Sequence, residues 1–145
     1  MRAVVWFRIA SILLLLFAVG HTFGFLSFQP STAEGRAVWT AMNDVHFSVG
    51  HSTFSYGAFY KGFGLSITGF QLFMAWLAWQ LGSMAKRGVM DARVIAWGIV
   101  GLQIVGAGLA LRYFSVAPAL FSVATLFSFV AATVSMRRQP LESGL

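Results

Sequence analysis

The sequence contains no cysteine, and this absence removes several kinds of chemistry at once. Disulfide bonds, thiolate metal sites, cysteine nucleophiles and CxxC redox pairs are all excluded. Acidic residues are scarce as well, because Asp and Glu together number 4 in 145 residues. None of them lies inside a long apolar run, whereas four-helix proton-coupled exporters use a buried carboxylate as the coupling group. The sequence therefore disfavours that class of transporter.

Charged residues of either sign are few. They make up 10% of the chain, against about 25% in soluble domains, while hydrophobic residues make up 58% and the mean hydropathy is +0.77. This composition predicts an integral membrane protein in contact with membrane lipids. The net charge of +6 comes from basic residues at the ends of apolar runs, so we interpret it as a topology signal and expect no nucleic-acid partner.

Four apolar runs are long enough to span a bilayer as helices. They cover residues 3–28, 54–82, 94–113 and 116–136, and the long connection between the first two is residues 29–53. The predicted fold is an all-α membrane protein with one transmembrane domain over residues 1–145, built as a four-helix bundle. For the first run a cleaved signal peptide is the alternative, because Ala18, Val19 and Gly20 resemble a cleavage site, but the apolar sequence continues to Phe28.

The distribution of basic residues predicts the orientation, since such residues resist translocation. One side would carry Arg2, Lys86, Arg87, Arg93, Arg137 and Arg138, and the other Arg36, Lys61 and Arg112. Both termini are therefore expected in the cytoplasm of a multi-pass inner-membrane protein, with the 29–53 connection outside.

The outer connection itself predicts a short interfacial helix. Ser31 and Glu34 have the spacing of a capping box, which favours a helix over residues 32–47, and Gly50 is a suitable stop after it. On such a helix Trp39, Asn43 and His46 would share one face and cover the mouth of the bundle.

Small and polar residues recur on one face of the second run, which we expect to look inward. These residues are Gly57, Lys61, Gly64, Thr68, Gln71, Ala75 and Ala78. In the third run Gly98, Gly101 and Gly106 predict close helix approach and make self-association plausible. Arg8, near the inner end of the first run, is expected to extend to the headgroups.

Titratable and polar side chains gather in the outer half, and they form the candidate site. The predicted catalytic residues are His21, His46 and Lys61, and the predicted substrate-binding residues are Asn43, Asp44, His51, Tyr60 and Arg112. The histidines would move a proton while Lys61 holds an oxyanion or a quinone carbonyl. A metal bound by the three histidines and Asp44 is a weaker alternative, since no HExxH or paired Glu-x-x-His spacing supports it.

Two short motifs carry a family resemblance. Gly20-His21-Thr22-x-Gly24 ends the first span and Tyr60-Lys61-Gly62-Phe63-Gly64 opens the second, after an early Arg8 and an outer loop. The first 82 residues resemble small bacterial four-helix membrane proteins, loosely similar to the DoxX-like group. That resemblance implies an association with membrane redox complexes and quinone-linked chemistry.

Together these features predict an outer-leaflet pocket that binds a small apolar molecule, such as a quinone or a lipid-like compound, with acid/base chemistry at the polar cluster. The alternative is a non-catalytic accessory or structural subunit of a membrane complex, or a homo-oligomer, whose polar groups serve only packing.

Overall fold

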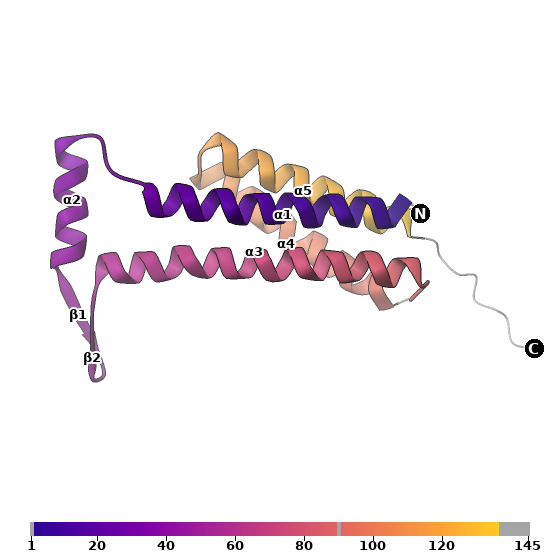
Figure 1. Cartoon of the computed structure of the whole chain (residues 1–145), viewed down its shortest axis with the longest axis horizontal. Helices are drawn as coiled ribbons and strands as arrows, with labels where there is room; N and C mark the ends of the chain where they lie inside the picture. The colour runs from indigo at the N-terminus through magenta and orange to yellow at the C-terminus, as the bar shows by residue number, and fades with distance from the viewer. Residues whose placement is uncertain (1, 90, 137–145) are drawn as a thin grey trace, which may run out of the picture. The chain divides into compact units, whose positions relative to one another are not determined.

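Most of the chain folds into helices, and the all-α fold class is confirmed. The computed structural model describes residues 2–89 and 91–136. These residues form α1 (Arg2–Ser27), α2 (Ala33–Asp44), α3 (Tyr56–Lys86), α4 (Asp91–Tyr113) and α5 (Val116–Ser135), with β1 (His46–Val49) and β2 (Ser52–Ser55) between α2 and α3 (Figure 1). By length and composition, α1, α3, α4 and α5 are able to cross a membrane.

Backbone contacts divide the chain into two compact units that share α1 and α3. Unit 1 comprises Met1–Phe17 and Gln71–Leu145, and unit 2 is Ala18–Phe70. Unit 1 therefore holds the first part of α1, the last part of α3, α4 and α5. Unit 2 holds the end of α1, α2, the hairpin and the start of α3.

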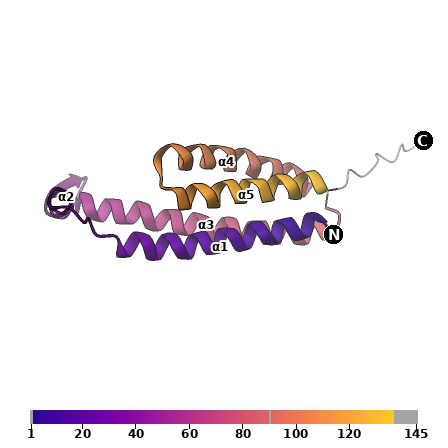
Figure 2. The same ribbon diagram turned by 90° about the horizontal axis from the view of Figure 1, so that it is seen from above.

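The apolar core of unit 1 is made by all four of its helical segments. Phe7, Leu81 and Phe129 have no exposed surface, and the Phe7 and Phe129 rings meet edge to face with centroids 6.1 Å apart. The short joint between α4 and α5 makes them antiparallel neighbours, and Figure 2 shows them running side by side. These three side chains come from α1, α3 and α5, and Ala96, Ile99 and Val100 of α4 belong to the same core, so burial of apolar surface holds the four segments together.

Two predictions about unit 1 are wrong in detail. The glycines of α4 do not mediate close approach within the described residues, since a Cβ at Gly98, Gly101 or Gly106 would meet nothing within 4 Å. Alanines on another side of α4 are buried instead: Ala92, Ala96, Ala107 and Ala110. Arg8 does not extend outward either, because its Nη2 donates to Ser83 Oγ at 3.1 Å and its Nη1 is buried without a partner.

The helix in the outer connection is present, but its cap lies one residue later than the predicted capping box. Thr32, not Ser31, is the N-cap, and its Oγ1 accepts from the backbone N–H of Gly35 at 3.0 Å. Gly35 suits this turn because a Cβ there would lie 2.9 Å from the Cβ of Pro30. The helix ends at Asp44 rather than residue 47, and the chain then enters β1.

The β-hairpin was not predicted, because Gly50 was interpreted as a helix stop. The strands pair from His46 opposite Ser55 to Val49 opposite Ser52, which leaves Gly50 and His51 as a two-residue turn. Gly50 has φ 59, as the first central position of a type II′ turn requires. The hairpin also sets the start of α3, since Ser55 Oγ accepts from the N–H of Ala58 at 3.1 Å and caps the helix.

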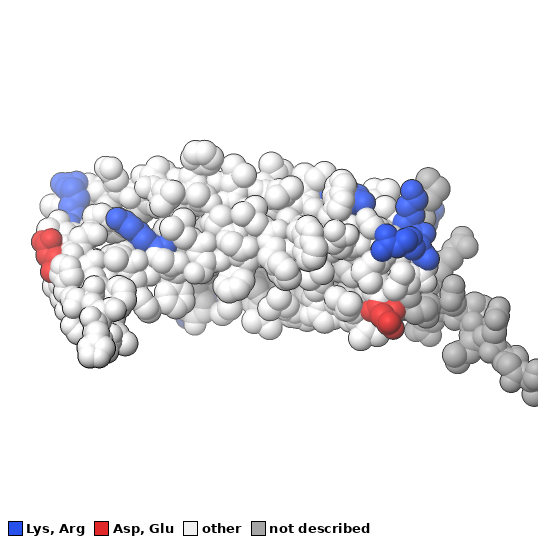
Figure 3. Space-filling view, turned by 60° about the horizontal axis from the view of Figure 1, so that its bottom comes forward, with Lys and Arg blue, Asp and Glu red and all other residues white. Residues whose placement is uncertain are grey.

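Large apolar side chains cover much of the helical surface. Phe63, Phe70 and Phe73 on α3 are 61%, 70% and 56% exposed, and Val94 and Val116 exceed 70%. On the face seen in Figure 3, charged side chains are sparse and uncharged residues cover the helices between them. Such a surface is unusual for a protein in water, where charged residues are common on exposed helix faces.

Candidate functional site

His21 lies in unit 2 and connects the last turns of α1 to α3. Its Nε2 is 3.1 Å from the backbone carbonyl oxygen of Gly64. Because a carbonyl only accepts, this contact places the proton on Nε2, and in the neutral ring Nδ1 is then the acceptor. The imidazole also stacks on Phe25, with centroids 5.6 Å apart and the planes 16° from parallel. His21 is thus oriented from two sides.

Gly64 allows α1 and α3 to approach at this level. A Cβ at Gly64 would overlap the ring of Phe25, so any larger residue would displace that ring. One turn away, the hydroxyls of Thr22 and Thr68 are 2.8 Å apart. Thr22 donates its only hydroxyl hydrogen to the carbonyl of Ala18 at 2.7 Å, so Thr68 is the donor in the pair.

An aromatic cluster continues from His21 toward α2, and we define it as His21, Phe25, Phe28, Trp39 and Tyr60. Tyr60 lies 5.1 Å from Phe25 and 6.1 Å from Trp39 between ring centroids, and Trp39 is 6.2 Å from Phe28. These separations are those of favourable aromatic pairs. Tyr60 is 42% exposed, and among the described residues its hydroxyl has no hydrogen-bond partner.

Asn43 holds α2 against the first turn of α3. Its Nδ2 donates to the carbonyl of Trp39 at 2.7 Å, and a Cβ at Gly57 would lie 2.5 Å from its Oδ1. Asn43 is half-buried and supports the Trp39 turn. Through Trp39 it stands beside the aromatic cluster, and one of its two amide N–H groups is already used within α2.

His46 does not share a helix face with Trp39 and Asn43, which corrects the prediction for that residue. Since α2 ends at Asp44, His46 is the first residue of β1 and is exposed. Its Nδ1 contacts the backbone carbonyl of Asp44 at 2.7 Å rather than the carboxylate. This contact lies within the turn that leads from α2 into β1.

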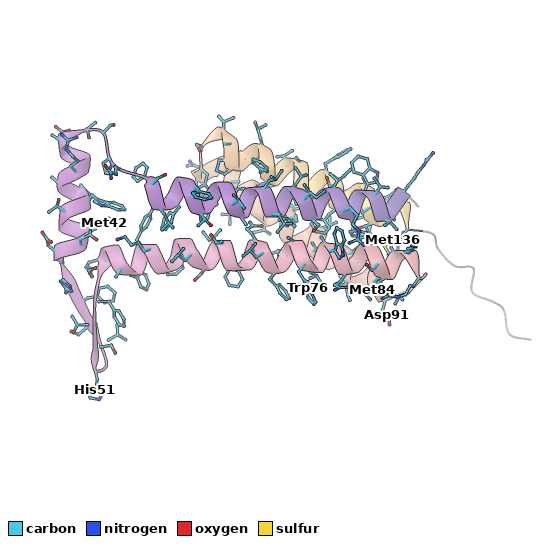
Figure 4. The ribbon with its side chains drawn as sticks, viewed as in Figure 1. Met42, His51, Trp76, Met84, Asp91 and Met136 are labelled. Atoms are coloured by element: carbon cyan, nitrogen blue, oxygen red, sulfur yellow. The ribbon has the colours of Figure 1, made fainter. Side chains whose placement is uncertain are left out.

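The remaining predicted site residues are exposed. His51 occupies the hairpin tip (Figure 4), and Lys61, next to Tyr60, makes no hydrogen bond or ion pair within residues 2–89 and 91–136. Arg112 belongs to unit 1, where its guanidinium carbon is 5.4 Å from the ring centroid of Tyr113. No three His, Asp or Glu side chains of the described part of the chain could hold a metal ion together, so the metal alternative has no site here.

Sequence reasoning missed Phe25 as the ring that stacks on His21, and it did not pair Thr68 of α3 with Thr22 of α1. The signals were present: Phe25 follows His21 by four residues and so lies on the same face of the helix, and Gly64 and Thr68 have the same spacing on α3. The residue spacing alone does not show which face of α1 contacts which face of α3.

Comparisons with protein-family models, with curated proteins and with solved structures give no match. The resemblance to the DoxX-like group therefore stays a prediction, and the site's own geometry carries the functional argument.

Proposed function

We propose that this chain is an integral membrane protein that crosses the bilayer four times through α1, α3, α4 and α5. Support comes from four helices that are long and apolar enough to cross a membrane, and from the exposed phenylalanines and valines on their surfaces. In lipid these side chains meet acyl chains instead of water, so their exposure has no cost.

The basic residues support an orientation with both termini in the cytoplasm of an inner membrane. Arg2, Lys86, Arg87 and Arg93 stand at the ends of α1, α3 and α4 on the proposed inner side. Arg137 and Arg138 would add to this side, but they lie outside the described residues. The α2 helix and the hairpin would then face the outer compartment.

For the aromatic cluster we propose binding of a small, planar, apolar molecule of the quinone or lipid-like class. The observation that carries this proposal is the run of rings from His21 to Trp39, in the middle of which Tyr60 carries a hydroxyl without a hydrogen-bond partner in the described structure. Aromatic faces bind a planar ring, and a phenol donates a hydrogen bond to a carbonyl oxygen.

His21 is the residue best placed for proton transfer in such a site. Imidazole is the side chain that most readily exchanges protons near neutral pH, and that of His21 is held in the aromatic cluster by the Gly64 carbonyl and the Phe25 ring. The ammonium of Lys61 is exposed one residue after Tyr60 on α3, and its long side chain would turn toward the cluster to neutralise an oxygen anion formed on the ligand. His46, Asp44 and His51 have no role in this proposal.

The experiment is a titration of nanodisc-embedded protein with decylubiquinone, followed by tryptophan fluorescence. Tyr60→Phe keeps the ring and removes the hydroxyl, and should weaken binding about fivefold, as expected for a hydrogen bond of roughly 1 kcal/mol. Tyr56→Phe is the matched control on the same helix and should leave the affinity unchanged. Equal effects of the two variants, or saturation by neither wild type nor control, would reject the proposal in favour of an accessory subunit.

A further inference from the structure

The hairpin between α2 and α3 has one apolar and one polar face. Side chains alternate across a strand, and paired residues share a face. The register puts Phe47 opposite Phe54 and, two residues on, Val49 opposite Ser52. The other face carries His46, Ser48, Thr53 and Ser55. Ser48 and Thr53 are joined by a hydrogen bond of 3.2 Å across that polar face.

Nothing in the described structure covers the apolar face at its outer end. Val49 is 63% exposed and Phe54 44% exposed, while Phe47 is half-buried. An isolated two-stranded hairpin is at best marginally stable in water, so its apolar face needs a partner. The hairpin also has no Lys, Arg, Asp or Glu in either strand, although edge strands in water commonly carry charges.

The apolar face is continuous with one side of α3. Phe47 contacts Tyr56 and Phe59, with ring centroids 4.8 and 5.8 Å away, and Phe59 contacts Phe63 at 5.0 Å. Phe59, Phe63 and Phe70 follow at steps of four and seven, so they share one helix face, and Phe63 and Phe70 are 61% and 70% exposed. The surface therefore runs without a charged residue from the hairpin onto the part of α3 proposed to face lipid.

We infer that the hairpin is a lipid-interface anchor. Its Phe47, Val49 and Phe54 face lies in the headgroup and acyl boundary of the outer leaflet, and its His46, Ser48 and Thr53 face is turned to water. The inference rests on the proposed membrane insertion of α3 and deepens it by naming the partner of the hairpin. Trp and Tyr, whose rings carry a polar group, are enriched in this zone, and Tyr56 at the base of the hairpin fits it.

The absence of cysteine makes the test direct, because single-cysteine variants have no background. Val49→Cys and Phe54→Cys probe the apolar face, and the adjacent Ser48→Cys and Thr53→Cys are the matched controls on the polar face. Each full-length variant is spin-labelled in phosphatidylcholine and phosphatidylglycerol vesicles, and collision rates with oxygen and with a water-soluble nickel chelate are measured. Phe70→Cys serves as the reference for membrane insertion of α3.

We expect the oxygen-to-nickel collision ratio to be severalfold higher at residues 49 and 54 than at 48 and 53. Equal, nickel-accessible values on both faces would overturn the inference by placing the hairpin in water. Exclusion of both reagents from residues 49 and 54 would also overturn it, because a protein partner would then cover the face. A nickel-accessible Phe70→Cys would instead reject membrane insertion itself, so the two failures are distinguishable.

Discussion

Arg8 stacks on Trp79. Its guanidinium carbon lies 3.2 Å from the centroid of the indole ring, and Ser83, one turn further along α3, accepts a hydrogen bond from Nη2. Within the described residues no carboxylate pairs with this cation, and its Nη1 is buried without a partner. Inside unit 1 the guanidinium of Arg8 is thus contacted by the indole face and by the Ser83 hydroxyl.

This arrangement predicts a measurable coupling between the two side chains. In a double-mutant cycle of Arg8→Met and Trp79→Leu, the interaction free energy should be about 1 kcal/mol, the value of a partly desolvated cation–π pair. Reversible unfolding in mixed detergent micelles measures the free energy of unfolding for the four proteins. Additive effects of the two substitutions would show that the stacking contributes no stability.

Gly64 and Gly62 form a matched pair on the same helix. Gly64→Ala would press its methyl group on the Phe25 ring and disturb the stacking on His21, so we expect a loss of about 1–3 kcal/mol in the free energy of unfolding. At Gly62 a Cβ would meet nothing within 4 Å. Gly62→Ala should therefore stabilise the helix by roughly 0.5–1 kcal/mol. Thermal unfolding followed by circular dichroism distinguishes them, and the same sign for both variants would contradict the close contact.

The close contact between α2 and the first turn of α3 depends on Gly57. In Gly57→Ala the new methyl group would push against Asn43 Oδ1 and, at 3.2 Å, against the Met42 carbonyl. We expect faster amide hydrogen exchange across α2 in this variant, while exchange in α4 and α5 is unchanged. Gly69→Ala, where a Cβ would meet nothing within 4 Å, is the control on α3. Unchanged α2 protection in Gly57→Ala would mean that Asn43 does not fix this helix.

The proposed four-span topology also predicts which connections a membrane-impermeant maleimide labels from outside the cell. Ser31 and Ser115 are exposed in the connections before α2 and before α5, and Asp91 is exposed at the start of α4. In intact cells, Ser31→Cys and Ser115→Cys should be labelled from outside, and Asp91→Cys only after lysis. Labelling of positions 31 and 115 from opposite sides would exclude four antiparallel spans.

The sequence predicts which segments are helical better than it predicts where the helices end. Continuous apolar runs leave few alternatives to a helix, and the small-residue face of α3 is largely buried as expected, with Gly57, Gly64, Ala75 and Ala78 all covered. Lys61 shares the nominal face but is exposed. The helix pattern alone does not show how far each residue of that face is covered, and a long flexible side chain reaches solvent where glycine and alanine do not.

The arrangement of the predicted site residues follows only in part from the sequence, and the differences come from helix caps, turns and strand pairing. Whether Thr32 or Ser31 caps α2 depends on the path of the chain after Pro30, and both residues have the side chain required. The hairpin had a signal in its alternating residues around Gly50, but a glycine is equally suited to end a helix. Once α2 stops at Asp44, His46 leaves the predicted cluster, whereas His21 and Tyr60 meet through Phe25.

The central claim is that the aromatic cluster of unit 2 holds an apolar molecule, and native mass spectrometry of protein extracted from its membrane in mild detergent tests it most directly. The account predicts one retained small molecule in the wild-type protein and in Tyr56→Phe. It predicts reduced retention in Tyr60→Phe and in Gly64→Ala, which displaces the Phe25 ring. Wild-type protein that emerges without any bound molecule, or a molecule retained equally by all four proteins, would contradict the claim.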